Sequence, residues 1–147
     1  MHRPRHKPRT AGRKLALRGL CLVFLTTVLG CIPGYVRVSV SAAQDINGKQ
    51  PVYMLVRSLE RKVYLAESYG EVASKLVEGD ATVLRKELLF PGQSRSIYIK
   101  KPKGPLALYF LFTAPGGTWR LFVEPALPLQ VKAELKGNRL VQDSTLF

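Results

Sequence analysis

The thiol of Cys31 is the group in this sequence whose surroundings point most directly to a chemical reaction. Cys31 follows Gly30 and a largely apolar stretch over residues 19–30. The segment before that stretch contains no acidic residue and seven basic ones: Arg3, Arg5, Lys7, Arg9, Arg13, Lys14 and Arg18. A basic segment, a short apolar stretch and a small residue at the cleavage point are the parts of a bacterial export signal.

Residues 28–31, Val-Leu-Gly-Cys, resemble a lipobox. In such a motif the cysteine thiol is diacylated, the leader is removed, and the cysteine becomes the new N-terminus. We therefore predict a signal peptide over residues 1–30, lipidation of Cys31, a tether over residues 31–34 and a folded domain over residues 35–147. Cys21 is a small apolar residue of the signal, because Arg18 stands where a lipobox has an apolar residue.

Other interpretations of this segment are a simple secreted or anchored protein and a basic arm for nucleic acid. A transmembrane helix needs about 20 apolar residues, more than the stretch before Cys31 offers. A nucleic-acid arm would fit residues 1–14 but would not explain an apolar stretch that ends in Gly-Cys. The sequence favours the lipoprotein.

The charge and size of the mature chain also restrict its function. The leader holds seven of the 23 basic residues and none of the ten acidic ones, which leaves sixteen basic and ten acidic residues and a net charge of +6. This mild excess suits anionic lipid or an acidic partner and is well short of a nucleic-acid signature. About 117 residues suit one domain with one core.

The mature chain lacks the residues that most catalytic sites need. Both histidines, His2 and His6, lie in the leader, and Cys31 is the one cysteine that remains. Zinc sites of His and Cys and nucleophiles activated by His are thereby excluded, and we expect no metal and no cofactor. The acidic residues are scattered, and only convergence of Glu87 and Glu124 in a cleft would revive an enzymatic function. We expect a protein that is not an enzyme.

Alternating and apolar stretches separated by turn residues predict about seven strands. The extended stretches lie at residues 35–41, 52–59, 83–90, 93–101, 106–112, 118–123, 129–135 and 139–142. Period-two alternation is typical of strands with one buried face, and the nearly all-apolar stretch 106–112 is typical of a strand buried on both faces. The predicted fold is a mainly β sandwich with a short helical insert.

The helical insert is predicted over residues 60–76, as one helix or as two short pieces around Gly70. Its apolar positions form one stripe: Val63, Leu65, Tyr69, Val72 and Leu76. Packing of this stripe onto the sheet is the favoured interpretation. A helix lying on a membrane surface is the alternative.

Several short motifs, in their order behind the lipobox, resemble one family, the type VI secretion outer-membrane lipoprotein TssJ. They are the stretch 41–52 with its Asp-Ile-Asn-Gly-Lys segment and Pro51, then Val56-Arg57 and Leu59, then Pro91-Gly92-Gln-Ser after Glu87, then Trp119-Arg120, and finally Gly137-Asn138-Arg139. The resemblance implies a transthyretin-like β-sandwich of about seven strands with an added helix. It also implies a role in recruiting and anchoring the periplasmic domain of the inner-membrane protein TssM.

The resemblance further implies that the loop between the first two strands, residues 42–50, binds this partner. The candidate contacts are Gln44, Asp45, Ile46, Asn47, Gly48 and Lys49. A loop on a rigid sandwich can present Asp45 and Lys49 for charged contacts and Ile46 as an apolar anchor. A solvated turn with no partner is the alternative for this loop.

Ile32, which would follow the acylated cysteine, implies transfer to the outer membrane under the usual sorting rule for lipoproteins. The other function considered is a generic envelope lipoprotein with a ligand-binding or pilotin-like β-sandwich. Trp119 is expected in the core, with Arg120 pointing outward or paired with an acid. The basic turn that carries Lys100, Lys101 and Lys103 is a solvated turn or meets anionic lipid.

Overall fold

The computed structural model describes residues 34–146, with side chains through residue 141. The predicted signal peptide and the predicted lipidation site, Cys31, lie outside the described residues. No helix within the described part of the chain is long and apolar enough to cross a membrane.

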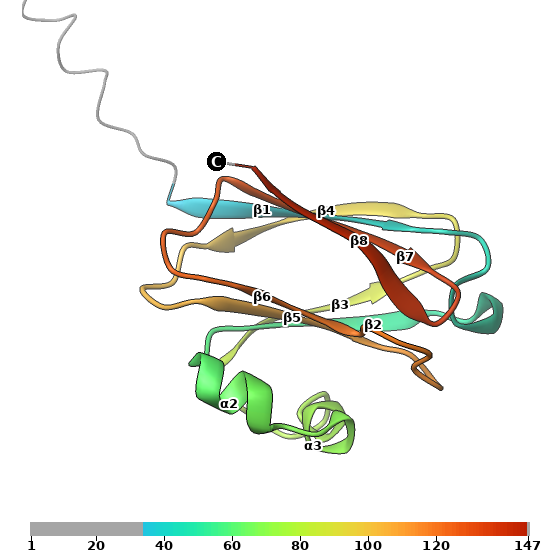
Figure 1. Ribbon diagram of the computed structural model, residues 1–147, viewed down its shortest axis with the longest axis horizontal. Helices are drawn as coiled ribbons and strands as arrows, with labels where there is room; N and C mark the ends of the chain where they lie inside the picture. Colours follow the sequence, from blue (N-terminus) through green and yellow to red (C-terminus); the bar gives the residue numbers. More distant parts are fainter. Residues whose placement is uncertain (1–33, 147) are drawn as a thin grey trace, which may run out of the picture. The chain divides into compact units, whose positions relative to one another are not determined.

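Two four-stranded sheets form a β-sandwich (Figure 1), so the predicted fold class is confirmed. The first sheet has the order β4-β1-β7-β8, and the second has the order β3-β2-β5-β6. The strands are β1 (Tyr35–Ala42), β2 (Val52–Arg57), β3 (Val83–Leu89), β4 (Ser94–Lys100), β5 (Leu106–Leu111), β6 (Arg120–Val123), β7 (Gln130–Lys136) and β8 (Arg139–Leu146). Strands β1 and β7 pair in parallel, and the other pairs are antiparallel.

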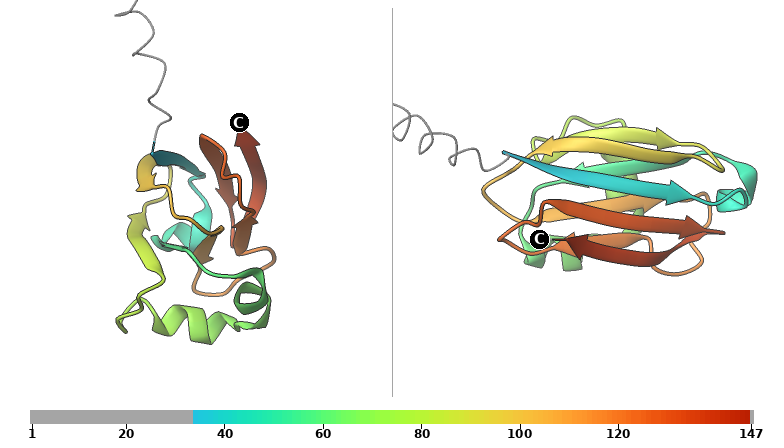
Figure 2. Two further views of the ribbon diagram at one scale, coloured as in Figure 1. Left: turned by 90° about the vertical axis from the view of Figure 1, so that its left-hand side faces the viewer. Right: turned by 90° about the horizontal axis from the view of Figure 1, so that it is seen from above.

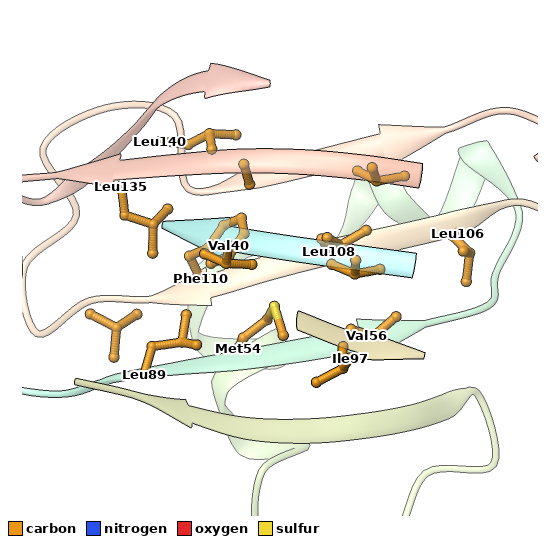
Figure 3. Close-up of a cluster of buried hydrophobic side chains, with 14 of the residues drawn as sticks. Val40, Met54, Val56, Leu89, Ile97, Leu106, Leu108, Phe110, Leu135 and Leu140 are labelled. Atoms are coloured by element: carbon orange, nitrogen blue, oxygen red, sulfur yellow. The ribbon is translucent and has the colours of Figure 1, made fainter. Parts of the chain in front are cut away.

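The core lies between the sheets, where apolar side chains from the strands of both sheets meet (Figure 3). In β1 the inward side chains are Val36, Val38, Val40 and Ala42, as the alternation predicts. Strand β5 is buried on both faces. Leu106, Leu108 and Phe110 join the core, whereas Ala107, Tyr109 and Leu111 belong to a second apolar cluster outside the second sheet.

Two short helices cover the second sheet on its outer side, α2 (Arg61–Ala66) and α3 (Tyr69–Ser74) (Figure 1). Packing onto the sheet is confirmed for α3, whose Val72 is fully buried. The predicted continuous stripe is wrong at its start, since Val63 and Leu65 are exposed. The reason is the break at Glu67 and Ser68, where extended backbone ends α2 and Ser68 begins α3 with a capping box to Glu71, so one helical period does not run through both.

The connections gather at the two ends of the sandwich. Strand β1 begins at one end, and the first loop with its 3₁₀ turn η1 (Ile46–Lys49) lies at the other (Figures 1 and 2). Three further connections, residues 90–93, 112–119 and 137–138, join strands at the η1 end, as the strand registers require. We call this the loop end. Gly34 and the turn 101–105 lie at the opposite end, where the Lys101 N–H donates to the Gly34 carbonyl at 2.7 Å.

Candidate partner-binding loop

The first loop is a rigid segment built on three consecutive residues with left-handed backbone. Asn47, Gly48 and Lys49 have φ of 50°, 62° and 65°. Left-handed backbone costs a residue with a Cβ roughly 1–2 kcal/mol, and Asn tolerates it best after Gly. A conformation of this kind persists only where surrounding contacts impose it.

Asn47 provides those contacts by joining three segments. Its Nδ2 donates to the Pro51 carbonyl at 2.8 Å, and its Oδ1 accepts from the Thr113 N–H at 2.7 Å. Its backbone N–H donates to the Gly137 carbonyl at 2.8 Å. Because the side chain is only 7% exposed and its polar atoms are paired within the protein, Asn47 holds the loop rather than offering a contact.

Ile46 does not present an apolar side chain to a partner, so the expectation of an apolar anchor at this position is wrong. The side chain is 0% exposed and belongs to the core between the sheets. Burial of an isoleucine side chain stabilises the fold by roughly 2–3 kcal/mol, so the short turn places Ile46 inward. The buried Ile46 side chain thereby attaches the loop to the core.

The exposed residues of the loop are Gln44, Asp45, Gly48, Lys49 and Gln50. The Gln44 side chain lies against the turn at residues 91–92. Gly92 in that turn has a φ of +74°, and a Cβ atom at position 92 would come within 2.2 Å of Gln44 Nε2. The Asp45 Oδ1 accepts from the Gly137 N–H at a long 3.4 Å. The structure thus brings the loop together with two turns distant in sequence, 91–92 and 137–138.

An open hollow lies beside Asp45 at the loop end. It has a volume of about 350 Å³ and is lined by Asp45, Gly116, Lys136, Gly137, Asn138 and Arg139. One carboxylate and two cations therefore face it, with the flexible cation of Lys49 on the adjoining turn. This arrangement can bind a polar or acidic protein surface, but it offers no nucleophile or general base with a partner.

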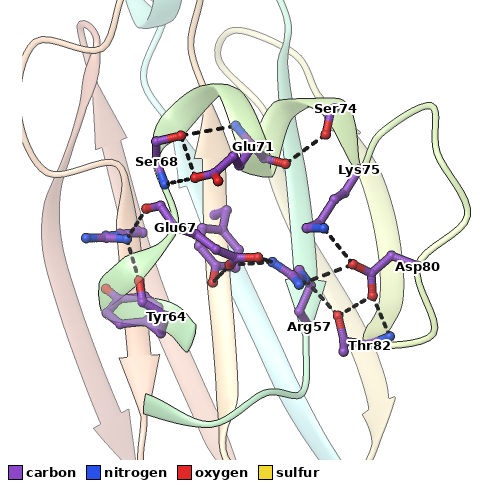
Figure 4. Close-up of polar contacts among 11 residues, drawn as sticks. Arg57, Tyr64, Glu67, Ser68, Glu71, Ser74, Lys75, Asp80 and Thr82 are labelled. Atoms are coloured by element: carbon purple, nitrogen blue, oxygen red, sulfur yellow. Dashed lines mark hydrogen bonds and ion pairs between the residues drawn. The ribbon is translucent and has the colours of Figure 1, made fainter. Parts of the chain in front are cut away.

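A buried polar network that sequence reasoning did not find lies between the helices and the second sheet (Figure 4). Arg57 is 2% exposed. Its Nη1 donates to both carboxylate oxygens of Glu67, at 2.9 and 2.7 Å, and its Nη2 lies 3.3 Å from Asp80 Oδ2. Its Nε donates to Thr82 Oγ1 at 2.9 Å. Arg57 in an otherwise apolar strand was the available signal, because a buried guanidinium requires acidic partners.

The electrostatics of this network hold Asp80 ionised. Hydrogen bonds from the Thr82 hydroxyl, the Lys75 ammonium and the Thr82 N–H lower the pKa of Asp80 below its ordinary value. Burial first, and the Glu67 carboxylate second, raise the pKa of the Tyr109 hydroxyl. Such shifts also occur in catalytic sites, but here each charged group is paired with another, which is the arrangement of a structural network.

Arg120 and Trp119 fasten the helices to the edge of the second sheet. Arg120 Nη1 donates to the carbonyls of Tyr64 and Glu67, the latter at 3.0 Å. The expectation that Arg120 points outward or pairs with an acid is wrong, because these carbonyls at the C-terminus of α2 attract a cation. Trp119 packs against Tyr69 and Tyr109, with ring centroids 4.9 and 5.8 Å apart. It was predicted in the core, and the structure places it partly buried against both apolar clusters.

Glu87 and Glu124 do not converge. Glu87 lies on β3 and pairs with Arg85, whereas Glu124 follows β6 and pairs with Arg61. Strands β3 and β6 are the opposite edges of the second sheet. Within residues 34–146 there is also no group of three or more Asp, Glu, His or Cys side chains that could hold a metal ion.

Most of the described chain matches a known protein family in sequence. The family model for the N-terminal domain of IglE matches residues 53–135, more than half of the chain. The chain belongs to the IglE N-terminal-domain family. The match starts within β2 and ends within β7, so it covers nearly all of the second sheet and both helices, but only β4 and most of β7 from the first sheet. No curated protein matches the chain in sequence.

Solved structures share the fold. The type VI secretion lipoprotein TssJ1 from Pseudomonas aeruginosa superposes with a TM-score of 0.60 at 17% identity, over 77% of this chain and 96% of its own. Lip from Serratia marcescens, described as a membrane-bound component of the type VI secretion system, gives 0.60 at 17%, over 76% and 98%. A chain in the structure described as the TssM C-terminal domain from EAEC gives 0.61 at 15%, over 73% and 95%. The resemblance to TssJ predicted from the sequence is confirmed at the level of the fold.

Proposed function

We propose that this chain is a lipid-anchored subunit of a type VI secretion membrane complex, and that it binds the periplasmic domain of a TssM-like inner-membrane protein. Its role is to anchor and recruit this partner, without enzymatic activity. Membership of the IglE family together with the fold shared with TssJ1 and Lip is the observation that carries the proposal.

The position of the anchor follows from the sequence. Acyl chains on Cys31, each contributing about 0.8 kcal/mol per buried CH₂, would hold the mature protein at the membrane. Ile32 after the cysteine directs the protein to the periplasmic face of the outer membrane. A tethered subunit raises the effective concentration of its partner, which favours assembly of a complex across the envelope.

The geometry of the sandwich suits this role. Strand β1 starts one residue after Gly34, which is three residues from Cys31, and ends at the loop end. Eight residues of strand span roughly 26 Å, so the first loop lies about this far from the point where the chain leaves for its anchor. The surface predicted to bind the partner is therefore held away from the membrane on a rigid scaffold.

Exposure supports some of the candidate contact residues in the first loop over others. Asp45 and Lys49 have exposed side chains, with Gln44 beside them, whereas Ile46 and Asn47 are buried. We propose that Asp45 and Lys49, with Lys136 and Arg139 around the adjoining hollow, make charged contacts with the partner. Burial of such pairs at an interface chiefly determines specificity and association rate.

The second candidate, a generic envelope lipoprotein that binds a ligand, has less support. A ligand-binding sandwich should have a concave pocket lined by aromatic side chains. The hollow at the loop end is lined by Gly, Asn and charged residues, and the hollow on the outer face of the first sheet is lined by four serines, three charged residues, a valine and an alanine, with no aromatic side chain. Neither has the lining of an apolar ligand site.

Calorimetric titration of the mature protein with the periplasmic domain of the TssM-like protein tests the proposal. The variant Asp45→Ala/Lys49→Ala removes one negative and one positive side chain from the loop. The matched control, Lys132→Ala/Glu134→Ala, removes the same pair from exposed positions on β7. We expect micromolar or tighter binding, weakened at least tenfold, or about 1.4 kcal/mol, in the loop variant alone.

Each outcome has a distinct meaning. If both variants bound the partner as tightly as the unmodified protein, the proposed role would stand, but the contact would lie outside Asp45 and Lys49. No binding by the unmodified protein would contradict the proposed role and favour the generic lipoprotein. Both variants change exposed side chains, so their unfolding curves should match that of the unmodified protein.

A further inference from the structure

A patch of tyrosines and basic residues lies at the end of the sandwich opposite the loop end. Its members are Tyr35, Arg37, Tyr98, Lys100, Lys101 and Lys103, and we call it the Tyr35 patch. Tyr35 and Tyr98 are 54% and 66% exposed, although the first sheet has an apolar inner face available to aromatic side chains. Neither tyrosine is explained by the core or by the first loop.

Strand register brings these residues together on the outer face of the first sheet. Tyr35 is paired with Lys100, and Arg37 is paired with Tyr98, so two aromatic rings and two cations occupy adjacent positions. Toward the loop end, the same two strands carry only serines on this face: Ser39, Ser41, Ser94 and Ser96. The patch is thus confined to the half of the face near Gly34.

The charge of the patch is uncompensated within its own segments. Strands β1 and β4 and the turn 101–105 contain no acidic residue. Among the described residues, the acids near this end lie with the second sheet and its helices, where Glu67 and Asp80 are paired with Arg57 and Glu124 is paired with Arg61. An anionic surface would therefore meet four cations on the side of the first sheet.

The position of the patch relative to the predicted anchor identifies that surface. The Lys101 N–H is bound to the Gly34 carbonyl at 2.7 Å, which fixes the basic turn beside the start of β1. Gly34 is three positions after Cys31, a distance of at most about 11 Å when the chain is extended. This maximum is comparable with the Debye length of about 8 Å at physiological salt, so an acylated Cys31 allows the patch to come within electrostatic reach of lipid headgroups.

We propose that the Tyr35 patch docks on the phosphate groups of anionic lipid and orients the sandwich at the membrane. This inference rests on the lipid anchor of the proposed function. The lysines and Arg37 bind phosphate oxygens, and the two tyrosine rings sit at the level of the headgroups with their hydroxyls in water. The acyl chains hold the protein at the surface, and the patch decides which side faces it.

Hydrogen–deuterium exchange of the acylated protein in vesicles tests the docking. One set of vesicles contains phosphatidylcholine alone, and the other contains phosphatidylcholine and phosphatidylglycerol at roughly two to one. We expect amides of residues 98–104 to exchange more slowly in the anionic vesicles. The difference should disappear at about 0.5 M NaCl, where screening is strong.

Two matched triple variants identify the cations responsible. Lys100→Gln/Lys101→Gln/Lys103→Gln removes three charges from the patch, whereas Lys62→Gln/Lys86→Gln/Lys132→Gln removes three from elsewhere on the surface. Each lysine near an anionic surface favours the docked state about fivefold. The patch variant should lower the ratio of docked to free protein on the order of a hundredfold and lose the slower exchange, whereas the control should retain it.

Flotation of the same samples separates this proposal from the anchor itself. Protein that floats with both kinds of vesicle but shows no lipid-dependent exchange at residues 98–104 would overturn the docking while leaving the anchor intact. If the protein floated only with anionic vesicles, and if this flotation required the patch lysines, the docking proposal would stand and the lipid anchor would be contradicted. Protein that floats with neither would overturn both.

The same patch variant in the calorimetric titration tests whether the TssM-like domain, rather than lipid, binds the Tyr35 patch. Unchanged binding of the TssM-like domain, together with loss of the slower exchange, is the result expected for a lipid contact. Weakened binding of the TssM-like domain with no lipid-dependent exchange would assign the patch to the protein partner and overturn the lipid docking.

Discussion

Arg57 shows how one buried charge ties two layers of the protein together. Its guanidinium lies over the Tyr109 ring, 5.7 Å from its centroid, and contacts Glu67 from the helical segment and Asp80 from the segment before β3. Removing one member of a buried ion pair leaves the partner charge without compensation, which generally costs more than the pair itself contributes. The network therefore belongs to stability, and its residues are separate from the candidate contacts of the loop end.

We predict that Arg57→Met lowers the free energy of unfolding by about 3–5 kcal/mol, because Glu67 and Asp80 lose their shared cation. Urea denaturation followed by circular dichroism measures the change. Arg85→Met is the matched control, since Arg85 is 55% exposed and pairs with Glu87 on the same strand, and it should cost about 1 kcal/mol or less. Equal losses in the two variants would contradict the structural role of the Arg57 network.

Asp80 makes stability depend on pH in the acid range. Hydrogen bonds from Thr82 and Lys75 lower its pKa in the folded protein below the ordinary value of 3.8. A lowered folded pKa stabilises the protein above pH 4, and this contribution is lost as the pH falls below 4 toward the folded pKa.

We predict that Asp80→Asn flattens the decrease in stability below pH 4, as measured by urea denaturation between about pH 6 and pH 2.5. The unmodified protein, measured in parallel over the same pH range, serves as the reference. An Asp80→Asn profile parallel to that of the unmodified protein would show that other carboxylates account for the acid dependence.

The first loop is the element whose shape depends most on contacts with other elements. Its left-handed residues are held by Asn47, which bonds the β5–β6 connection at Thr113 and the β7–β8 turn at Gly137. The loop end consequently behaves as one surface made of several connections. A change at a buried loop residue is expected to act through stability, and a change at an exposed one through binding.

We predict that Asn47→Ala lowers the free energy of unfolding by about 2–4 kcal/mol, since it leaves the Thr113 N–H unpaired and puts an alanine at a φ of 50°. Asn47→Gly loses the same hydrogen bonds but not the backbone fit, so it should be less destabilising by about 1 kcal/mol. Urea denaturation of both variants separates the cost of the lost hydrogen bonds from the cost of backbone strain. If alanine were as stable as glycine, backbone strain would not be a factor at this position.

In the whole molecule, the two proposed binding surfaces lie at opposite ends of the sandwich, separated by the length of β1. The end that leads to Cys31 carries the Tyr35 patch, and the loop end carries Asp45 and Lys49. This arrangement lets a subunit attach to a membrane at one end and to a partner at the other. It also means that each function can be disturbed without changing the other.

We predict that Cys31→Ser moves the protein from the membrane fraction to the soluble periplasmic fraction, because the thiol that receives the acyl chains is lost. Cys21→Ser is the matched control and should remain in the membrane fraction. Immunoblotting of fractionated cells measures the distribution. Recovery of Cys31→Ser in the membrane fraction would contradict the lipid anchor.

Sequence alone predicted the fold class and the positions of the strands along the chain, because period-two alternation depends only on which residues prefer the core. The order of the strands within each sheet came from the structure. Strand β1 shows the alternation most clearly, with its inward valines at every second position. The doubly buried β5 was also predictable, since its residues are apolar on both faces. The signal peptide, Cys31 and the identity of the partner remain predictions from the sequence.

Only the tertiary structure decided what individual loop and helix residues do. Ile46 turned inward and Asn47 became a structural contact because Pro51, Thr113 and Gly137, distant in sequence, surround them. Val63 and Leu65 stayed exposed because extended backbone interrupts the helices. The buried Arg57 network and the Tyr35 patch likewise depend on strand pairing, which brings together charges that local sequence patterns cannot relate.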